Sequence, residues 1–556
     1  MRFRGLAEAT TVIVAALALA CALTYPYALK FDHAGRLDTN DGRFSIWVVS
    51  WVAHALTTDP LGVFDANIYY PHRNTLAFSE AEIVEGIAAA PVWMLTKNPY
   101  TTHNVLFILS FVLSTAGGYY LVRYLTGDRR AAAVAGVLFA YCPFVFARTA
   151  HIQLLMIGFL PFSLLSFHRL MERLSIARAI ELGVVLCLTG LSCAYYGIFA
   201  GGMVALGTLM LAVTRGRLLD PKYWAIVAVA AVVCIGLTLP AFLPYVELQE
   251  QTGFARTLDD ARRYSANFGA WFASAAWAHR WWLPYIEGFS EVLFPGILTL
   301  SLGLWGAVAA VQRREPGPTS GGTDRNRLHG DTLAFYVVTL VLAFWTCLGP
   351  KAGLYTLLFN TVPVFSLLRA PARTGIVVTL CLVVLATLPI RRLMRGRWAG
   401  AVFAALLTLA VADLVQAPLY MRDAPPLPRA YETLALLPRG PVIEFPYWNT
   451  RPEFPRHAEY MVTSTSHWQP LINGYSDHIP QDFRDTVRPL SGFPSPESFA
   501  ILERLGARYA VFHFDKMDRN SREQIVQRIE VDYAQYLRPL ERDGDVWLLE
   551  IVDWPR

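Results

Sequence analysis

The sequence predicts an α-helical protein that crosses a membrane several times and ends in a small α/β domain. Of its 556 residues, 54% are hydrophobic and only 16% are charged, whereas soluble domains carry roughly 25% charged residues. Many apolar residues lie in runs of the length, about 17–25 residues, that an α-helix needs to cross a hydrocarbon core. Residues 421–556 lack such runs and instead show short strand-like and helix-like patterns.

About eleven apolar segments are predicted to span the membrane. They lie near residues 10–29, 104–124, 131–149, 152–170, 178–194, 197–213, 222–246, 292–312, 332–348, 373–389 and 398–417. Basic stretches such as RYLTGDRR and HRLMERLSIAR then fall on every second loop. The positive-inside rule places those loops in the cytoplasm. The amino terminus is therefore predicted inside and the tail outside.

The predicted membrane domain covers residues 1–420, and the predicted extracytoplasmic α/β domain covers 421–556. Two short apolar pieces interrupted by proline, 82–99 and 353–368, are predicted to be re-entrant or interfacial because they are too short to cross completely. The connecting parts are a first outer loop (30–103), an aromatic second outer loop (247–291) and a flexible cytoplasmic linker (315–330).

The stretch LDTNDGRFSIWVVSWVAHAL places Asp38 and Asp41 directly after the first apolar run. The apolar residues that follow recur at helical spacing, which predicts a helix lying on the membrane surface. Such a helix would hold a carboxylate at the level of the lipid headgroups, where a lipid-linked substrate presents its polar end. For either residue alone, a solvated loop carboxylate is the simpler alternative.

The rest of the first outer loop is long and rich in aromatic residues, which favours a functional loop over a disordered one. It supplies further polar side chains of the kind that bind substrates. These candidates are Asp65, His72, Arg73, Glu80 and Glu82.

The stretch LLRAPARTGIVV places Arg369 and Arg373 four residues apart at the outer end of a predicted span. Two guanidinium groups at this level can hold a phosphate or pyrophosphate through forked hydrogen bonds. The alternative is that both side chains contact the phosphates of ordinary lipids.

The second outer loop and the tail add candidates for substrate binding. The loop contains Trp281 and Trp282, which belong either to an interfacial aromatic belt or to a surface that contacts a sugar or an acyl chain. Glu287 and Glu291 follow and could make polar contacts at the site. The tail stretch STSHWQPLINGYSDHIP offers His467, Asn473 and Tyr475, either for acceptor binding or as part of a packed hinge.

Together these features resemble the GT-C superfamily, the multi-spanning glycosyltransferases that take a sugar from a polyprenyl-phosphate carrier on the outer face of the membrane. The points of similarity are Asp41 and Asp38 in the first outer loop, the amphipathic helix that follows, the proline-interrupted AAPVWML and the outer domain at the end. More closely, NDGRFSIWVVSWVAHAL, LRAPAR and AEYMVTSTSHWQPLINGYSDHIP look like the uncharacterised bacterial YfhO-like branch.

This resemblance implies an enzyme of the bacterial inner membrane that transfers a sugar, with inversion, from a polyprenyl-phosphate donor to an unidentified acceptor. Asp41 would be the catalytic base, with Asp38 beside it, while Arg369 and Arg373 would bind the leaving phosphate. The DTND stretch is a spaced pair and not a tandem acidic pair like that of metal-dependent oligosaccharyltransferases, so no cofactor is expected. A divalent ion such as Mg²⁺ or Mn²⁺ at Asp38 and Asp41 is the alternative.

The predicted partners are the lipid bilayer, the lipid-linked sugar and the acceptor, and no nucleic acid. Two other functions stay open: a transporter or flippase of lipid-linked glycans, and a non-catalytic accessory protein of envelope glycan assembly. A transporter would need charged groups deep in several spans. The predicted spans are almost uncharged, and Asp413 and Glu181 lie near the ends of theirs.

Overall fold

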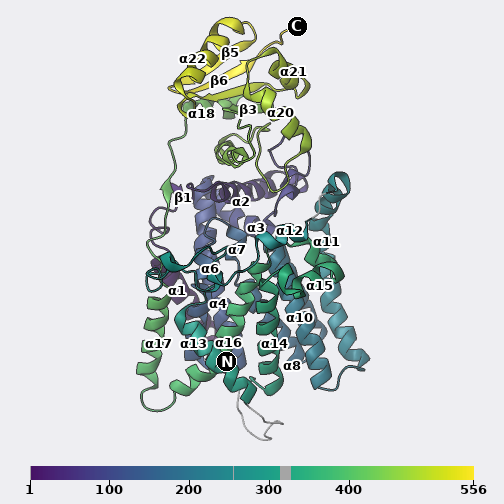
Figure 1. Ribbon diagram of the computed structural model, residues 1–556, viewed down its shortest axis with the longest axis vertical. Helices are drawn as coiled ribbons and strands as arrows, with labels where there is room; N and C mark the ends of the chain where they lie inside the picture. The colour runs from purple at the N-terminus through teal and green to yellow at the C-terminus, as the bar shows by residue number, and fades with distance from the viewer. Residues whose placement is uncertain (1, 254–255, 313–326) are drawn as a thin grey trace. The chain divides into compact units, whose positions relative to one another are not determined.

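The computed structural model describes residues 2–253, 256–312 and 327–556 and is mainly helical (Figure 1). Contacts between residues divide it into two compact units. The helical unit comprises Met1–Leu29, Leu106–Leu243 and Gln249–Leu419. The mixed unit comprises Lys30–Val105, Pro244–Leu248 and Tyr420–Arg556. The first outer loop is thus grouped with the tail, whereas the sequence predicts that this loop belongs to a membrane domain covering residues 1–420.

A helix occupies each of the eleven predicted ranges. The helices that lie wholly or mostly in the helical unit are α1 (Arg2–Leu23), α4 (Pro99–Thr126), α5 (Arg129–Ala140), α6 (Pro143–Phe146), α7 (Ile152–Leu155), α8 (Phe159–Glu172), α9 (Ile176–Ser192), α10 (Ala194–Thr214), α11 (Pro221–Thr252), α12 (Leu258–Arg263), α13 (Ile297–Gln312), α14 (Gly330–Cys347), α15 (Leu354–Thr361), α16 (Gly375–Leu393) and α17 (Ala399–Leu414). Within the described residues, seven helical segments are long and apolar enough to cross a membrane. The other four ranges hold the shorter helices α8, α9, α13 and α17.

The core of the helical unit forms around α16, whose residues from Gly375 to Ile390 are all buried. The long apolar run of this helix is enclosed by α5, α13 and α14. Helix α13 approaches most closely at Gly306, where a Cβ atom would lie 2.0 Å from the carbonyl oxygen of Leu385. Only glycine permits this approach, as is common between helices in membranes.

Ion pairs join the basic loops of the helical unit. Glu8 near the start of α1 pairs with Arg123 and Arg129, on either side of the α4–α5 turn, at 2.8 and 2.6 Å. Arg327, just before α14, pairs with Glu172 at the end of α8 at 3.1 Å. These contacts bring several of the basic segments to one end of the helical unit, as their alternation in the sequence predicts.

The proline-interrupted pieces are short helices. In the mixed unit α3 covers Ile83–Thr96, and in the helical unit α15 covers Leu354–Thr361, both shorter than a complete crossing needs. The linker predicted at 315–330 lies outside the described residues as far as 326, and α14 begins at Gly330.

The mixed unit contains a four-stranded sheet of order β3-β4-β6-β5, with bounds β3 (Val442–Phe445), β4 (Tyr509–His513), β5 (Leu537–Asp543) and β6 (Val546–Ile551). Strand β4 pairs parallel to β3 and antiparallel to β6, and β5 pairs antiparallel to β6. The helices of this unit are α2 (Asn40–Thr58), α3, α18 (Arg429–Leu436), α19 (Ala458–Thr463), α20 (Gln481–Ser491), α21 (Pro496–Arg504) and α22 (Arg519–Gln527). A two-residue pair, β1 (Ala34–Gly35) and β2 (Arg422–Asp423), completes it. The predicted α/β domain is confirmed.

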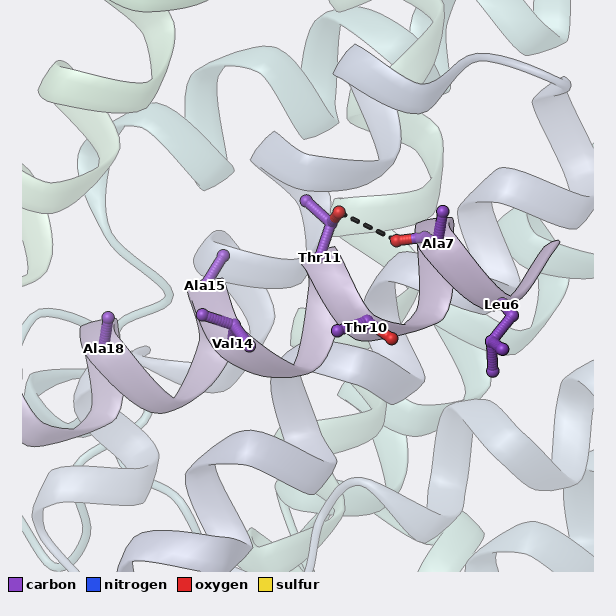
Figure 2. A pocket seen from close by; sticks show the side chains of 7 residues that line it. All are labelled: Leu6, Ala7, Thr10, Thr11, Val14, Ala15 and Ala18. Atoms are coloured by element: carbon purple, nitrogen blue, oxygen red, sulfur yellow. Dashed lines mark hydrogen bonds between the residues drawn. The ribbon is translucent and has the colours of Figure 1, made fainter. Parts of the chain in front are cut away.

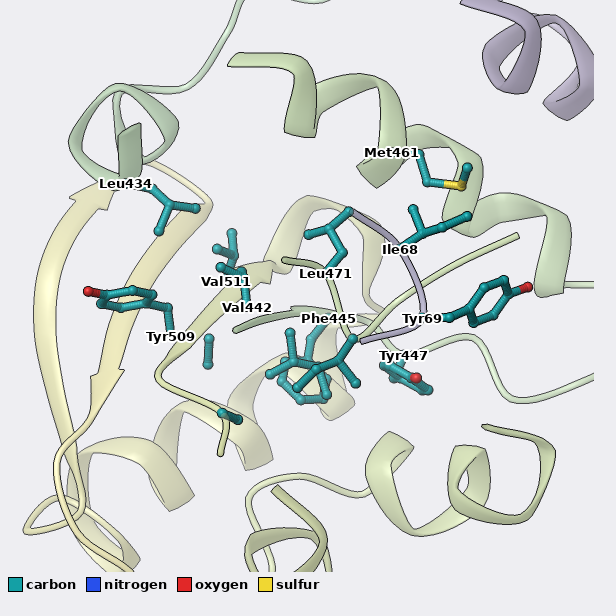
Figure 3. Close-up of a cluster of buried hydrophobic side chains, with 14 of the residues drawn as sticks. Ile68, Tyr69, Leu434, Val442, Phe445, Tyr447, Met461, Leu471, Tyr509 and Val511 are labelled. Carbon is teal, nitrogen blue, oxygen red and sulfur yellow. The ribbon is translucent and has the colours of Figure 1, made fainter. Parts of the chain in front are cut away.

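Backbone hydrogen bonds connect the first outer loop to the edge of this sheet. The Val442 amide in β3 donates to the Pro470 carbonyl at 2.8 Å. The segment that follows Pro470 is paired in turn with the loop, because the Tyr70 amide donates to Leu471 at 2.8 Å and the Tyr69 amide donates to Asn473 at 3.1 Å. Figure 3 shows Ile68 and Tyr69 of the loop in one hydrophobic cluster with residues of the tail.

Helix α2 is buried within the mixed unit. Trp47 and Val48 on its apolar face are almost fully buried, and the helix packs against α3 and α19. The Trp47 indole donates to the Asn67 side chain at 3.2 Å. The apolar face predicted to contact the membrane surface therefore packs against the protein itself, and the start of this helix is held in a fixed position.

Candidate functional site

Asp41 lies in the first turn of α2 and is exposed. The N-cap residue Thr39 accepts a hydrogen bond from the Gly42 amide at 3.1 Å, which fixes this turn. A carboxylate here is favoured by the helix dipole. Asp41 Oδ1 accepts a hydrogen bond from the Tyr475 hydroxyl of the tail at 3.3 Å. The structure thus brings together two of the predicted site residues and leaves the carboxylate accessible to a substrate.

Asp38 is held differently, by both arms of one guanidinium. Arg36 donates from Nε and Nη2 to the two carboxylate oxygens at 2.9 and 3.1 Å. Partial burial raises the pKa of Asp38, but the hydrogen bonds and charge of Arg36, aided by Arg422, outweigh burial and hold this pKa below its usual value. Asp38 is therefore an ionised anchor for the turn, and Asp41 is the better placed base.

The two aspartates offer a poor fit to a divalent ion, because Arg36 already occupies both oxygens of Asp38. Across the part of the chain that the structure describes, no three His, Cys, Asp or Glu side chains are grouped so that they could hold a metal ion. Oxygen-ligand ions need several converging carboxylates. Metal dependence nevertheless stays a prediction to be tested by experiment.

The remaining candidates in the first outer loop mostly support its fold. Asp65 accepts a hydrogen bond from the Asn74 amide at 2.8 Å and closes a turn. His72 pairs with Asp482 of α20 at 2.9 Å. Arg73 is exposed, and Glu80 is half-buried.

Glu82 is almost completely buried directly before α3. Burial, and to a lesser degree the charges of Glu85 and Glu80, raise its pKa well above the usual value. We therefore expect Glu82 to be a neutral carboxylic acid, which suits it to donate a hydrogen bond and not to act as a base.

The tail candidates other than Tyr475 are enclosed in the mixed unit. The Asn473 side chain bonds both the amide and the carbonyl of Glu444, at 2.8 and 2.9 Å, and so ties its segment to β3. His467 accepts a hydrogen bond from the Gln469 amide at 3.0 Å, and its ring lies parallel to that of Tyr431. These contacts favour the packed alternative over acceptor binding for both residues.

Arg369 and Arg373 lie beside tyrosine rings in the helical unit. The Arg373 guanidinium lies 4.4 Å from the centroid of Tyr195 in α10, and that of Arg369 lies 5.3 Å from Tyr264. The Tyr195 hydroxyl also accepts a hydrogen bond from the Arg369 amide at 3.1 Å. Stacking engages the face of a guanidinium, whereas forked hydrogen bonds to phosphate use its edge.

A third guanidinium belongs to this arginine cluster, which we define as Arg148, Arg369 and Arg373. Arg148 follows α6, is 5% exposed, and pairs with Glu291 at 2.5 Å. Arg373 is near enough for its charge to act on Arg148. Arg148 was not among the residues predicted from the sequence, although a lone arginine at the end of the apolar stretch FVFARTAH is the signal that could have identified it.

The other candidates of the second outer loop lie on a part of it that is held to the end of α17. Trp282 stacks on His279 with ring centroids 5.0 Å apart, whereas Trp281 and Glu287 are exposed. His279 Nε2 pairs with Asp413 of α17 at 2.7 Å, and its Nδ1 lies 2.9 Å from the hydroxyl of Ser274. All three members of this triad are buried, so it holds the loop in place and cannot reach a substrate.

An open hollow on α1 is lined by apolar residues and threonine (Figure 2). All seven of its lining residues, from Leu6 to Ala18, belong to this one helix. The hollow brings no charged groups together, and a lipid chain would fill it as well as any ligand. It is not the candidate site.

The long apolar helices define a polytopic membrane protein. The family model described as "6-pyruvoyl-tetrahydropterin synthase related domain; membrane protein" matches residues 87–420, and the chain belongs to this family. The match leaves Asp38, Asp41 and the tail outside it. No curated protein is similar to the chain in sequence.

Solved structures share the fold. Archaeal oligosaccharyltransferase AglB from Archaeoglobus fulgidus, in complex with an inhibitory peptide and a dolichol-phosphate, has 14% identity and a TM-score of 0.50, over 93% of this chain and 70% of that chain. The Archaeoglobus fulgidus oligosaccharyltransferase in complex with Zn and sulfate gives 14% identity and a TM-score of 0.50, over 91% and 68%. These similarities confirm the predicted GT-C-like fold class.

Proposed function

We propose that this protein is a membrane glycosyltransferase that moves a sugar from a polyprenyl-phosphate donor to an acceptor hydroxyl on the outer face of the membrane. The observation that carries the proposal is the exposed Asp41 carboxylate, which the turn of α2 and the Tyr475 hydroxyl fix in place. The AglB structure with the same fold contains a dolichol-phosphate, which is a long-chain isoprenoid phosphate. This supports a donor of the same chemical class here.

In the proposed reaction Asp41 takes the proton of the acceptor hydroxyl while that oxygen attacks the anomeric carbon of the sugar. The bond between this carbon and the donor phosphate breaks, and the configuration inverts. The phosphate leaves with the bonding electrons, and guanidinium groups stabilise its negative charge, which is the role that the sequence predicts for Arg369 and Arg373. General-base assistance of this kind is typically worth roughly 10²- to 10⁴-fold in rate.

The same proposal includes a site that works without a metal ion, because Arg36 already neutralises Asp38. It also places the protein in the bacterial inner membrane, with the amino terminus inside and the tail outside. The alternation of basic and non-basic loops supports this orientation. The acceptor could be a lipid, a protein or a cell-wall polymer.

The transporter alternative lacks support from the ionisable residues of the spans. Asp413 caps α13 by accepting hydrogen bonds from the Ile297 and Leu298 amides at 3.2 and 3.0 Å. Glu181 pairs with Arg169 at 2.8 Å. Carboxylates bound in this way have structural roles and are not arranged as an ion pathway.

Mass spectrometry of lipid-linked and surface glycans, with and without the gene, tests the proposal. A transferase predicts that one glycan product disappears and that its donor accumulates on the outer side. Accumulation of the lipid-linked sugar on the inner side would instead indicate a flippase. Unchanged glycans in a strain without the gene would refute both functions.

A further inference from the structure

The Arg148–Glu291 ion pair has no part in the reaction described above, yet Arg148 belongs to the arginine cluster. Exposed fractions of the two side chains are only 6% and 19%. Breaking a buried pair by removing one partner is costly, because a buried charge is then left without compensation. An anion therefore has to accompany Arg148 whether or not a substrate is bound.

The Arg148 guanidinium is held by groups other than Glu291. Its Nη1 donates to the Phe144 carbonyl at 2.8 Å, and its carbon lies 3.5 Å from the centroid of the Phe144 ring. Glu291 comes from an irregular segment before α13 and binds the other terminal nitrogen, Nη2. Departure of the carboxylate would thus leave Arg148 in position with an Nη2 group ready to bind another anion.

We propose that Arg148 is a third phosphate-binding group of the arginine cluster, and that Glu291 occupies its place until the donor phosphate displaces it. The inference rests on the proposed function for the identity of the anion. A phosphate matches the forked geometry of a guanidinium as a carboxylate does. With more negative charge and more oxygen atoms, the phosphate also gains more from the nearby charge of Arg373.

Displacement has a consequence for both affinity and stability. Glu291 competes with the donor phosphate, so removal of its charge should strengthen binding. The same removal should destabilise the unliganded protein, because Arg148 is then buried without a counter-ion. A bound phosphate should restore the lost stability.

The experiment compares Glu291→Gln with Glu250→Gln, an exposed glutamate of the same predicted outer loop, in the purified full-length protein. The melting temperature and the dissociation constant are measured with geranyl phosphate as a soluble probe. We expect Glu291→Gln to melt lower than wild type without probe, to recover with it, and to bind it roughly three- to tenfold more tightly. Glu250→Gln should behave as wild type in all three respects.

Unchanged or weaker binding by Glu291→Gln would overturn the inference. If this variant does not fold, Arg148→Lys gives a second test, because lysine keeps the charge but loses the fork and should bind the probe about tenfold more weakly. Wild-type affinity in Arg148→Lys would also overturn it.

Two further arms separate this inference from the proposed function. In one outcome, Arg369→Ala and Arg373→Ala lose probe binding, whereas Glu291→Gln binds the probe with wild-type affinity. This outcome would refute only the inference that the donor phosphate displaces Glu291 from Arg148. Full binding in those two arginine variants would refute the proposed phosphate site itself. Equal affinity for geranyl phosphate, inorganic phosphate and dihexanoyl phosphatidic acid would overturn the assignment of the anion to an isoprenoid donor.

Discussion

The Tyr475 hydroxyl donates a hydrogen bond to Asp41 Oδ1 at 3.3 Å, although the two residues are 434 positions apart in the sequence. The ring of Tyr475 also packs edge-on against Phe44 of α2, with centroids 6.0 Å apart. The tail is therefore part of the acidic site, and not only a domain attached after the last membrane helix.

Replacement of Tyr475 by phenylalanine tests whether this contact orients the carboxylate. The ring and its packing on Phe44 are kept, and the hydrogen bond to Asp41 is lost. We expect kcat for sugar transfer to fall about tenfold, with little change in KM for the donor, because orientation of the base matters mainly in the transition state. A variant in which KM rises and kcat is unchanged would show that Tyr475 binds substrate instead.

Chelation tests the metal-free site. Since Arg36 engages both oxygens of Asp38, we expect excess EDTA to leave the rate of sugar transfer unchanged. The matched measurement adds Mg²⁺ or Mn²⁺ to the chelated protein. Loss of activity with EDTA that either ion restores would contradict this prediction.

Acidification should destabilise the mixed unit. Burial is the main cause that lowers the pKa of His457 to about 4, and burial aided by Lys97 and Arg439 lowers that of His54 to about 4. Between pH 4 and the unfolded value near 6.5, the unfolded chain binds more protons than the folded one. The free energy of unfolding therefore falls as the pH falls through this range.

Melting curves from pH 7 to pH 4 measure this effect. His457→Asn should make the free energy of unfolding fall less between pH 7 and pH 4, by at most about 3 kcal/mol. A slope that His457→Asn does not alter would show that this histidine is not the source of the pH dependence.

The membrane orientation predicts which surface residues an impermeant thiol reagent can reach. In a background without the native cysteines, Arg519→Cys in the exposed part of the tail should react in intact spheroplasts. Arg395→Cys, in the exposed turn between α16 and α17, should react only after permeabilisation. The reverse pattern would overturn the predicted topology.

Patterns that are local in the sequence predicted most of the fold. The long apolar run of α16 and the short, mostly apolar runs of β3, β4 and β6 were recognisable because their lengths differ and turn residues bound the strands. Strand β5 was not recognised, since LRPLERD contains a proline and four charged residues, which mark an edge strand only once its partner is known.

Contacts between distant segments were beyond the reach of these patterns. The pairing of Tyr69 and Tyr70 with the segment after Pro470 depends on backbone hydrogen bonds between residues about 400 positions apart, and no periodicity encodes it. For the same reason Asp41 and Tyr475 were both named as candidates, but their contact was not foreseen. Arg148 was missed because its partner Glu291 is likewise far along the chain.

The role of Asp41 is tested most directly by the rate of sugar transfer from a polyprenyl-phosphate donor by the purified protein. Asp41→Asn keeps the size of the side chain but cannot accept the proton. We predict that its rate falls by roughly 10²- to 10⁴-fold, while Asp32→Asn, at an exposed position earlier in the same loop, retains the wild-type rate. Wild-type transfer by Asp41→Asn would contradict the account.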